Sequence, residues 1–278
     1  MPLRPIGEVA LEGALASKAG SLLKHLASLE SVLVAFSGGV DSSLLLAAAA
    51  EACPDNILAV TVSSPVFPVR ELENARRIAR LSGSPHRVAG LDVLRVPSFS
   101  GNPADRCYHC KKAIFERLLE IAAAEGLARV VEGSNVDDLS DYRPGEKALR
   151  ELGIASPLRQ ADFTKADVRA LSAKIGLPES DRPAMACLAS RFPHGTEITA
   201  AALARVERLE DLLISMGFNQ VRARYHGDLV RFELDPGLLA RATSPAMRDR
   251  IVQAARREGF RFVTIDLQGY RMGSLNPG

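Results

Sequence analysis

The hydrophobic pattern of the first two thirds of the chain alternates between short apolar runs and longer segments with helical spacing. Leucines within 11–29 recur near helical spacing and lead into the apolar run 31–36. The pattern then predicts a helix that opens at Val40, strands over 57–63, 86–93 and 128–132, and helices over 70–81 and 113–125. Such alternation is typical of a parallel sheet with helices on both faces. We therefore expect an α/β fold of the doubly wound type.

The pattern changes after the loop around Pro183 to Pro193. It predicts a helix over 199–216, strands over 220–224 and 229–234, a helix over 245–258 and a strand over 262–266. The two neighbouring strands flank His226-Gly227-Asp228 and are predicted to form a hairpin, which suits a small α+β domain. With the boundary near Cys187, we expect one domain over residues 1–186 and a second over 187–278.

Composition limits the classes of protein that fit. The chain has 278 residues, of which 47% are hydrophobic, enough to fill a sizeable core, and its net charge is only +2. Without a long basic block, we expect no nucleic-acid partner. Charged residues interrupt the first 30 positions, which argues against a signal peptide, and no apolar run is long enough to span a bilayer. We expect a cytoplasmic protein with no membrane partner.

A serine- and glycine-rich string directly follows the first predicted strand. It reads Ser37-Gly38-Gly39-Val40-Asp41-Ser42-Ser43 and opens a helix. A phosphate group needs several backbone N–H groups at one point, which glycines and a helix N-terminus supply. Ser37, Ser42 and Ser43 add hydroxyl groups, and Asp41 is suited to hold Mg²⁺. The string lacks the lysine of a Walker A loop. The alternative interpretation is a turn with serine caps.

A second polar string follows the predicted strand 128–132. It reads Gly133-Ser134-Asn135. Ligands of parallel sheets bind at the carboxyl ends of the strands, so this string and the Ser37–Ser43 loop should lie at the same edge. We expect Gly133 and Asn135 to take part in ATP binding.

Three of the four cysteines are candidates for chemistry. Cys107-Tyr108-His109-Cys110 is predicted to lie in a loop just before a helix that begins with Lys111-Lys112, and Cys187 lies at the proposed boundary. Cys53 is interpreted as a small buried apolar residue. A helix N-terminus and nearby lysines favour the thiolate. Three thiolates suit a [4Fe–4S] cluster with one open iron. A closed Cys₃His zinc site that uses His109 or His194 is the alternative.

Several strings together resemble the LarE family of ATP-dependent sulfur transferases, which make a nickel-pincer cofactor and contain a PP-loop. They are the Ser37–Ser43 loop, residues 102–112, residues 133–138 with 141–145, residues 186–191 and residues 221–224. The match covers most of the chain in the order of the family. The resemblance implies that ATP adenylylates the carboxylates of a pyridinium-3,5-dicarboxylate mononucleotide, and that sulfur delivered at Cys187 displaces AMP to give thiocarboxylates.

The resemblance also implies roles for further residues and partners. Some family members sacrifice the sulfur of the Cys187 equivalent, whereas others have all three cysteines and bind a cluster, and this sequence has the three. The substrate's phosphate and carboxylates need cationic partners, for which Arg191, Arg222 and Arg224 are the candidates. Glu210 and Glu233 match acidic positions that could hold a divalent metal. Asp137, Asp138 and Arg143 are expected on the nucleotide side. The family forms trimers or hexamers, so we expect a homo-oligomer that uses a separate sulfide or sulfur donor.

Three other functions remain open at this point. A tRNA thiolase shares the PP-loop and sometimes three cysteines, but should carry a basic surface for RNA. An amidotransferase-type ligase would have no use for the cysteines. A zinc-stapled nucleotide sensor would bind ATP without releasing pyrophosphate.

Overall fold

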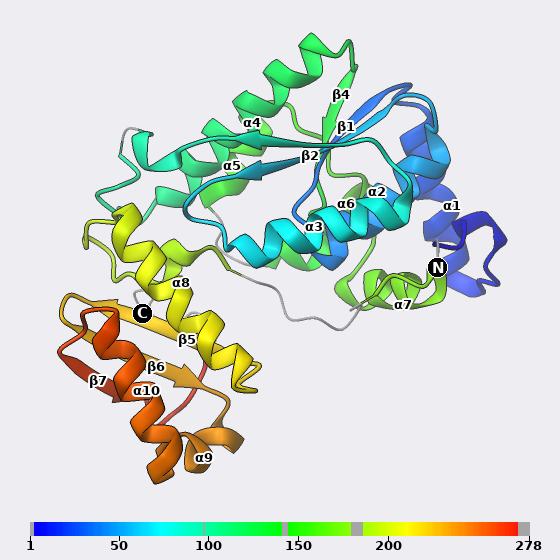
Figure 1. Ribbon diagram of the computed structural model, residues 1–278. Coiled ribbons are helices and arrows are strands. Elements are labelled where there is room, and N and C mark those ends of the chain that lie inside the picture. The colour runs from blue at the N-terminus through cyan, green and yellow to red at the C-terminus, as the bar shows by residue number, and fades with distance from the viewer. Residues whose placement is uncertain (1–2, 97, 141–143, 179–185, 272–278) are drawn as a thin grey trace. The chain divides into compact units, whose positions relative to one another are not determined.

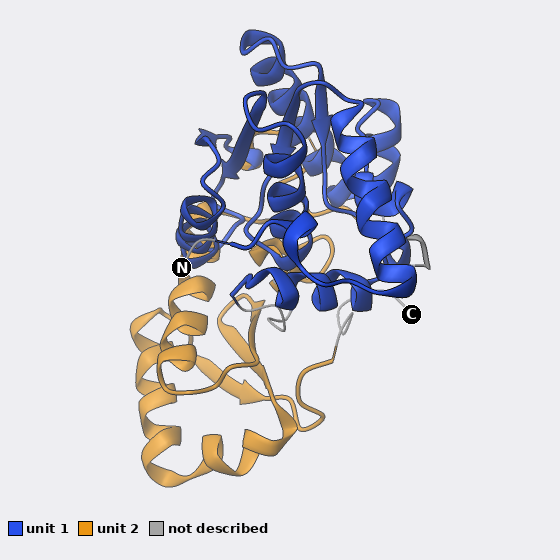
Figure 2. Cartoon of the chain, turned by 90° about the vertical axis from the view of Figure 1, so that its right-hand side faces the viewer, with its two compact units in different colours: residues 1–93, 105–185 blue, residues 94–104, 186–278 orange. Residues whose placement is uncertain are grey.

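The computed structural model describes residues 3–96, 98–140, 144–178 and 186–271. The chain divides into two compact units, the first of residues 1–93 and 105–185 and the second of residues 94–104 and 186–278 (Figure 2). The segment 94–104 lies in the second unit, although the sequence analysis assigned it to the first domain. The amide of Asn102 explains this placement, because its Nδ2 donates to the carbonyls of Phe192 at 3.2 Å and Pro193 at 2.7 Å.

A parallel sheet forms the centre of the first unit (Figure 1). Its four strands lie in the order β3-β2-β1-β4 and all pair in parallel. The strands are β1 (Val32–Ala35), β2 (Ile57–Ser63), β3 (His86–Gly90) and β4 (Arg129–Val131). The order reverses direction between β1 and β4, so a crevice at their carboxyl ends is the expected ligand site. The predicted α/β class is confirmed.

The helices of the first unit cover both faces of this sheet. They are α1 (Gly13–Ala27), α2 (Val40–Ala52), α3 (Val69–Ser82), α4 (Arg106–Ala124), α5 (Pro144–Glu151), α6 (Pro157–Gln160) and α7 (Lys165–Ile175), with short 3₁₀ turns η1 (Ile6–Glu8), η2 (Val93–Arg95) and η3 (Val136–Ser140). The sequence analysis did not predict α5, α6 or α7.

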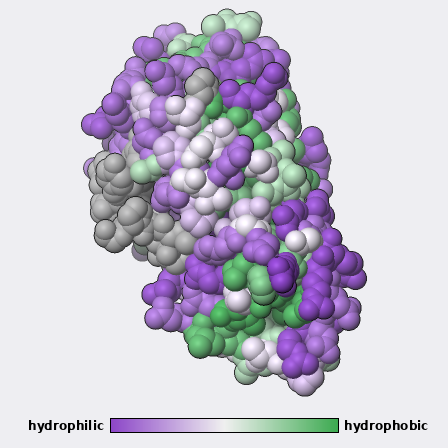
Figure 3. Space-filling model, turned by 90° about the vertical axis from the view of Figure 1, so that its left-hand side faces the viewer, coloured by the Kyte–Doolittle hydropathy of each residue, from purple (hydrophilic) through white to green (hydrophobic). Residues whose placement is uncertain are grey.

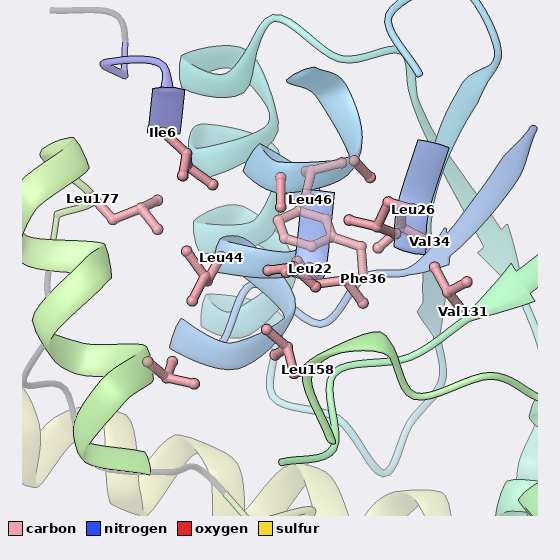
Figure 4. Packing of buried hydrophobic residues seen from close by; sticks show 14 of the residues in the cluster. Ile6, Leu22, Leu26, Val34, Phe36, Leu44, Leu46, Val131, Leu158 and Leu177 are labelled. Carbon is pink, nitrogen blue, oxygen red and sulfur yellow. The ribbon is translucent and has the colours of Figure 1, made fainter. Parts of the chain in front are cut away.

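Side chains of β1 alternate between two cores, as the period of a strand requires. Val34 packs with Leu22 and Leu26 of α1 and with Leu44 and Leu46 of α2 in the cluster that Figure 4 shows. On the opposite face, Leu33 packs with Phe115, Leu118 and Ile121 of α4. Strand β1 is therefore packed on both faces, and the loop at its carboxyl end rests on a closely packed base.

The second unit is a small α+β arrangement, as predicted. Its elements are η4 (Leu188–Arg191), α8 (Ala200–Ser215), β5 (Val221–His226), β6 (Leu229–Leu234), η5 (Pro236–Leu238), α9 (Leu239–Thr243), α10 (Pro245–Arg257) and β7 (Phe262–Ile265). Strands β5 and β6 form the predicted antiparallel hairpin, whose turn contains Gly227 with φ of 70°. Strand β7 pairs in parallel with β6 after the crossover through α10.

Two expectations concern the helices and the surface: the absence of a membrane partner and the formation of a homo-oligomer. None of the described helices is long and apolar enough to cross a membrane. The face in Figure 3 is mostly hydrophilic, and apolar side chains gather on its part that belongs to the second unit. In that unit Phe262 of the edge strand β7 is 49% exposed and Leu267 is 88% exposed. The homo-oligomer stays a prediction.

Candidate active site

The Ser37–Ser43 loop joins β1 to α2 at the carboxyl edge of the sheet, where it was expected. Gly38 has φ of 77°, and a Cβ there would lie 2.8 Å from the Cα of Ala75 in α3. Only glycine fits this position, for both reasons. Nδ2 of Asn74, also in α3, donates to the Gly38 carbonyl at 3.0 Å. The loop is therefore shaped by its glycine and held by α3.

The serines of the loop have different surroundings. The Ser42 hydroxyl donates to the Gly39 carbonyl at 3.1 Å, lies 3.0 Å from Oγ of Ser37 and accepts from the Ser37 N–H at 3.3 Å. The Ser42 hydroxyl thus connects the start of the loop to the first turn of α2 by hydrogen bonds. Oγ of Ser43 is buried and has no hydrogen-bond partner among the residues that the structure describes. A buried hydroxyl without a partner is costly, so it marks a point where a ligand or water would be stabilised.

The string after β4 meets this loop directly. A Cβ at Gly133 would lie 2.9 Å from the backbone nitrogen of Ser42, so glycine is required for the close approach. Nδ2 of Asn135 donates to Oδ1 of Asp41 at 3.0 Å. The two strings that the sequence analysis assigned to ATP binding therefore share one edge and one hydrogen bond.

A lysine that the sequence analysis missed also reaches Asp41. Nζ of Lys165, the first residue of α7, pairs with Oδ2 of Asp41. The helix start is fixed by a capping box in which Thr164 and Asp167 bond each other's backbone N–H. Thr-x-x-Asp ahead of an apolar helical pattern is a readable start signal. It could have revealed α7, but not the contact with Asp41, which lies 124 positions earlier in the chain.

Acidic residues after β4 hold the loops in place. Oδ2 of Asp138 accepts from the Asn135 N–H at 2.9 Å, and Oδ2 of Asp137 accepts from the Lys165 N–H at 2.8 Å. The Asp138 carboxylate caps the backbone of its own loop, as short acidic side chains commonly do, whereas Asp137 connects this loop to the start of α7. The buried carboxylate of Glu132 accepts from the N–H and hydroxyl of Ser134 at 3.1 and 2.8 Å. Asp141, Tyr142 and Arg143 lie outside the described residues.

Cys107 and Cys110 lie within α4, not in a loop before it. The helix begins at Arg106, because no glycine or proline interrupts the sequence from Asp105 onward. Residues three positions apart share a helix face, so Cys107 in the first turn and Cys110 just beyond it lie on one side of α4. Cys107 is exposed and Cys110 is half-buried. A helix N-terminus is a setting in which thiolates are favoured, and the reactivity of these thiols stays a prediction.

Cys187 precedes η4 in the second unit and is half-buried. Its carbonyl accepts from the Ser190 N–H at 3.0 Å and from NH1 of Arg191 at 3.1 Å. NH1 of Arg191 also donates to the Ala186 carbonyl at 2.9 Å. One guanidinium therefore fixes the backbone on both sides of the thiol.

The same arginine forms a buried ion pair with Glu210 of α8. Its Nε and NH2 reach the two carboxylate oxygens at 2.8 Å each, and both side chains are 0% exposed. Burial alone would lower the pKa of Arg191 and raise that of Glu210. Each charge outweighs this for the other, so the pKa of Arg191 lies above its ordinary value and that of Glu210 below. Complete burial argues against the predicted substrate contact of Arg191 and the predicted metal contact of Glu210.

Arg222 and Arg224 lie two positions apart on β5 and are buried, not solvated. NH2 of Arg224 pairs with Oε2 of Glu233 at 2.6 Å, and its NH1 donates to the Ser190 carbonyl at 2.8 Å. Glu233 is 0% exposed and also pairs with Arg231 at 3.3 Å. Two arginines thus use this carboxylate, which argues against the predicted metal contact.

Arg222 is the arginine of this group that forms no ion pair with a carboxylate among the described residues, although Glu210 lies close enough for its charge to act on it. Its NH1 donates to the Val221 carbonyl at 2.8 Å and its guanidinium lies 4.9 Å from the Tyr270 ring centroid. Within the described ranges no carboxylate pairs with it. Burial lowers its pKa and the charge of Arg191 lowers it further, while the charge of Glu210 offsets part of this decrease. A desolvated arginine of this kind stabilises an anionic ligand more strongly than an exposed one.

The described residues contain no group of three or more His, Cys, Asp or Glu side chains placed to hold one ion. Cys107 and Cys110 belong to the first unit, and Cys187 belongs to the second. The assignment of Cys107, Cys110 and Cys187 to a [4Fe–4S] cluster stays a prediction.

The parallel sheet, the glycine-shaped loop at its carboxyl edge and the absence of a Walker lysine define a PP-loop ATP pyrophosphatase fold. The model of the asparagine synthase family matches residues 19–93, which contain this loop. The chain is 40% identical to pyridinium-3,5-bisthiocarboxylic acid mononucleotide synthase of Lactiplantibacillus plantarum over 94% of this chain and 95% of that protein. It is also 40% identical to an uncharacterized protein of Synechocystis sp., over 94% of this chain and 98% of that one.

A more distant similarity covers about half of each chain. The tRNA-specific 2-thiouridylase of Xanthobacter autotrophicus is 30% identical over 55% of this chain and 49% of that protein. The synthase matches nearly the whole chain, whereas the thiouridylase matches about half of it, so the match to the synthase decides the family. The chain belongs to the LarE family of ATP-dependent sulfur transferases.

Proposed function

We propose that this enzyme adenylylates the carboxylates of pyridinium-3,5-biscarboxylic acid mononucleotide and converts them to thiocarboxylates. The observation that carries the proposal is the 40% identity, over nearly the full length of both chains, to a synthase named for the bisthiocarboxylic acid product. In the first step a carboxylate oxygen attacks the α-phosphorus of ATP, which forms the acyl-adenylate and releases pyrophosphate. In the second step hydrosulfide attacks the carbonyl carbon, AMP leaves, and a thiocarboxylate and a proton remain. A carboxylate becomes a good electrophile only after this activation.

The first unit supplies groups suited to the first step. The backbone N–H groups of residues 37–43 and the N-terminus of α2 favour the departing pyrophosphate. Asp41 fits a Mg²⁺ ion by its donor chemistry, since Mg²⁺ prefers a carboxylate oxygen together with phosphate oxygens. Its carboxylate lies in the first turn of α2 and is only partly buried. The ion would reduce the negative charge on the phosphates while the carboxylate approaches.

The second unit supplies groups suited to the substrate. Arg222 is buried without a carboxylate partner in the described part of the chain, and Arg224 lies beside it in β5 with its charge shared by Glu233. We propose that Arg222 and Arg224 bind the phosphate or carboxylates of the mononucleotide. Arg191 acts differently, since it holds the backbone of Cys187.

For the sulfur step we propose that Cys107, Cys110 and Cys187 bind a [4Fe–4S] cluster. The support is the donor set, because three thiolates leave one iron open, and such an iron can carry sulfide. Cys107 and Cys110 share one face near the start of α4, and a helix N-terminus favours thiolates. The physiological donor would then be sulfide or a sulfur carrier.

The test is a turnover assay with anaerobically prepared protein, ATP, Mg²⁺, sulfide and the biscarboxylic mononucleotide. We expect equal amounts of AMP and pyrophosphate, and a substrate mass that rises by 16 per carboxylate as sulfur replaces oxygen (about 32 minus 16, the two atomic masses). Release of ADP would contradict the proposal. A parallel reaction with unmodified tRNA distinguishes the half-length relative, because thiolated tRNA would make RNA the substrate.

A further inference from the structure

The ion pair between Lys165 and Asp41 joins the start of α7 to the phosphate loop. We propose that Lys165 is the phosphate-binding lysine that the Ser37–Ser43 loop itself lacks, and that it neutralises Asp41 until Mg²⁺ and nucleotide arrive. When Mg²⁺ takes the carboxylate, the ammonium turns to the pyrophosphate oxygens. This inference rests on the proposed function, because it assigns a partner to the same ATP site.

The backbone of Lys165 is held in position from several directions. Its N–H donates to Oδ2 of Asp137 at 2.8 Å, and the Asp137 N–H donates to Oδ1 of Asn135 at 3.0 Å. On the other side, the capping box of Thr164 and Asp167 fixes the first turn of α7. Nζ of Lys18 bonds Oδ2 of Asp167 at 2.7 Å and ties that turn to α1. Such a base leaves only the flexible stem of Lys165 to move.

The pair is accessible to a ligand. The side chain of Lys165 is 30% exposed and that of Asp41 is 25% exposed. Arg191 and Glu210, by contrast, are both 0% exposed and closed to solvent. An exposed pair contributes at most about 1 kcal/mol to stability. Lys165 is therefore open to a ligand, and its pair with Asp41 adds little to the stability of the fold.

The charge of the loop also calls for a cation. Residues 37–43 contain no lysine or arginine, while the leaving group is a pyrophosphate with several negative charges. The N-terminus of α2 offers the equivalent of only about half a positive charge. In loops of the Walker type, a lysine within the loop fills this need. Here a lysine reaches the same loop from α7.

The two oxygens of Asp41 explain why Lys165 and Mg²⁺ act in turn. Oδ1 accepts from Nδ2 of Asn135 at 3.0 Å, and Oδ2 is taken by Lys165. A Mg²⁺ ion needs one of these oxygens at short range, so it competes with the ammonium for Oδ2. The released ammonium carries three N–H donors on a four-carbon stem and remains beside the loop. The exchange moves one positive charge from protein to phosphate without moving the helix.

The experiment compares full-length Lys165→Met and Lys165→Arg with the wild type. The control is Lys174→Met, at the other end of α7, whose Nζ donates to the Ala10 carbonyl at 3.2 Å. Mn²⁺ stands in for Mg²⁺ and is titrated against nucleotide-free protein by electron paramagnetic resonance. Inorganic pyrophosphate with Mg²⁺ is titrated by calorimetry. Circular dichroism and the thermal transition establish that each variant is folded.

We expect Lys165→Met to bind Mn²⁺ more tightly, by about fivefold, because a competing pair worth up to about 1 kcal/mol is gone. We expect the same variant to bind Mg²⁺-pyrophosphate about tenfold more weakly, which corresponds to about 1.4 kcal/mol. Lys165→Arg should recover most of the pyrophosphate affinity, and Lys174→Met should match the wild type in both titrations.

Folded Lys165→Met with unchanged affinities for both ligands would overturn the inference and leave the proposed function standing, provided that the wild type binds pyrophosphate and forms AMP. Weaker pyrophosphate binding without tighter Mn²⁺ binding would overturn the exchange. A wild-type protein that binds no Mg²⁺-pyrophosphate and forms no AMP would overturn the proposed function, and this inference with it.

Discussion

Arg191 and Glu210 form a two-point ion pair in which neither side chain is exposed, and the same guanidinium holds the carbonyls of Ala186 and Cys187. Glu210 also accepts from the Ala223 N–H of β5 at 3.0 Å. The pair therefore connects α8, β5 and the segment that carries Cys187. Replacement of either charge of this pair should therefore lower the free energy of unfolding strongly.

Removal of either partner should destabilise the second unit. Arg191→Met or Glu210→Gln leaves a buried charge or polar group without its partner, and the free energy of unfolding should fall by about 3 to 5 kcal/mol. Urea denaturation measures this. The control is Arg208→Ala, which breaks a pair with Glu258 from a side chain that is 58% exposed and should cost less than about 1 kcal/mol. Equal losses for the buried and exposed pairs would contradict this interpretation.

Gly133→Ala should impair ATP use because a Cβ would lie 2.9 Å from the Ser42 nitrogen and push the two loops apart. We expect pyrophosphate release to fall by at least about tenfold, together with a loss of stability of about 1 to 3 kcal/mol, as for overpacking. The matched control is Gly20→Ala in α1, where nothing lies within 4 Å of the added Cβ. That change should preserve activity and add about 0.5 to 1 kcal/mol of stability. Full pyrophosphate release from a folded Gly133→Ala variant would rule out the assigned role of this contact.

Much of the fold was predictable because its signals are local. The apolar runs of β1 and β2 and the glycines after β1 gave the sheet and its loop, and the hairpin followed from the residues around Gly227. The predicted start of α4 was wrong. The helix was expected to begin with Lys111-Lys112, after the cysteines, and it begins at Arg106. Helices α5 to α7 were missed, although Thr164 and Asp167 form a capping box.

The site was predictable only in part, for a physical reason. Gly133 and Asn135 could be placed beside Asp41, because the carboxyl ends of parallel strands share an edge. Lys165 could not, because its contact with Asp41 depends on the packing of α7. Nor does the alternation of Arg222 and Arg224 on β5 reveal that both are buried, or that Arg224 pairs with Glu233 while Arg222 does not.

Arg222→Met should weaken binding of the anionic substrate. Loss of a charge-assisted contact costs about 1.5 to 3 kcal/mol, so the dissociation constant should rise at least about tenfold. ATP binding should not change, since the Ser37–Ser43 loop lies in the other unit. Calorimetry with the biscarboxylic mononucleotide measures the effect, and Arg208→Ala again serves as the control. If Arg222→Met binds the mononucleotide as the wild type does, the buried cation is structural.

Asp167 should make stability depend on pH in the acid range. Burial alone would raise its pKa, but hydrogen bonds from Lys18 and Thr164 and the charge of Lys18 lower the pKa from 3.8 to about 2. Since the folded-state pKa is depressed, the ionised carboxylate adds stability above about pH 4, and this gain is lost as the pH falls toward about 2. The side chain is 24% exposed, so we expect about 1 kcal/mol after screening by water.

The test of this linkage compares the wild type with Asp167→Asn by urea denaturation at neutral pH and near pH 3. The difference in free energy of unfolding should shrink near pH 3, because Asp167 of the unfolded wild type is then mostly protonated while the folded protein still holds the charge. Glu120→Gln, which breaks an exposed pair with Arg117, should give no such trend. A difference between wild type and Asp167→Asn that is constant with pH would contradict the assigned pKa.

The last prediction concerns the sulfur step, for which Cys107, Cys110 and Cys187 offer two routes. If the three thiolates bind a [4Fe–4S] cluster, Cys187 persists through turnover, and alanine at any of the three positions should remove the iron and abolish sulfur transfer. Adenylylation should persist in these variants, because it depends on the Ser37–Ser43 loop. If Cys187 instead gives up its own sulfur, Cys107→Ala and Cys110→Ala should still transfer sulfur once.

The fourth cysteine provides the control for this series. Cys53 is buried, burial raises its pKa, and its Sγ lies 3.4 Å from the Leu26 carbonyl. Cys53→Ala should therefore keep the iron and sulfide content of the wild type after anaerobic purification. Intact-protein mass spectrometry after turnover then separates the routes, because a sacrificed Cys187 becomes dehydroalanine with the loss of H₂S, about 34 mass units, while a ligand keeps its mass. Dehydroalanine at Cys187 in active, iron-containing protein would overturn the cluster proposal, since a thiolate that is consumed cannot remain a ligand for the next cycle.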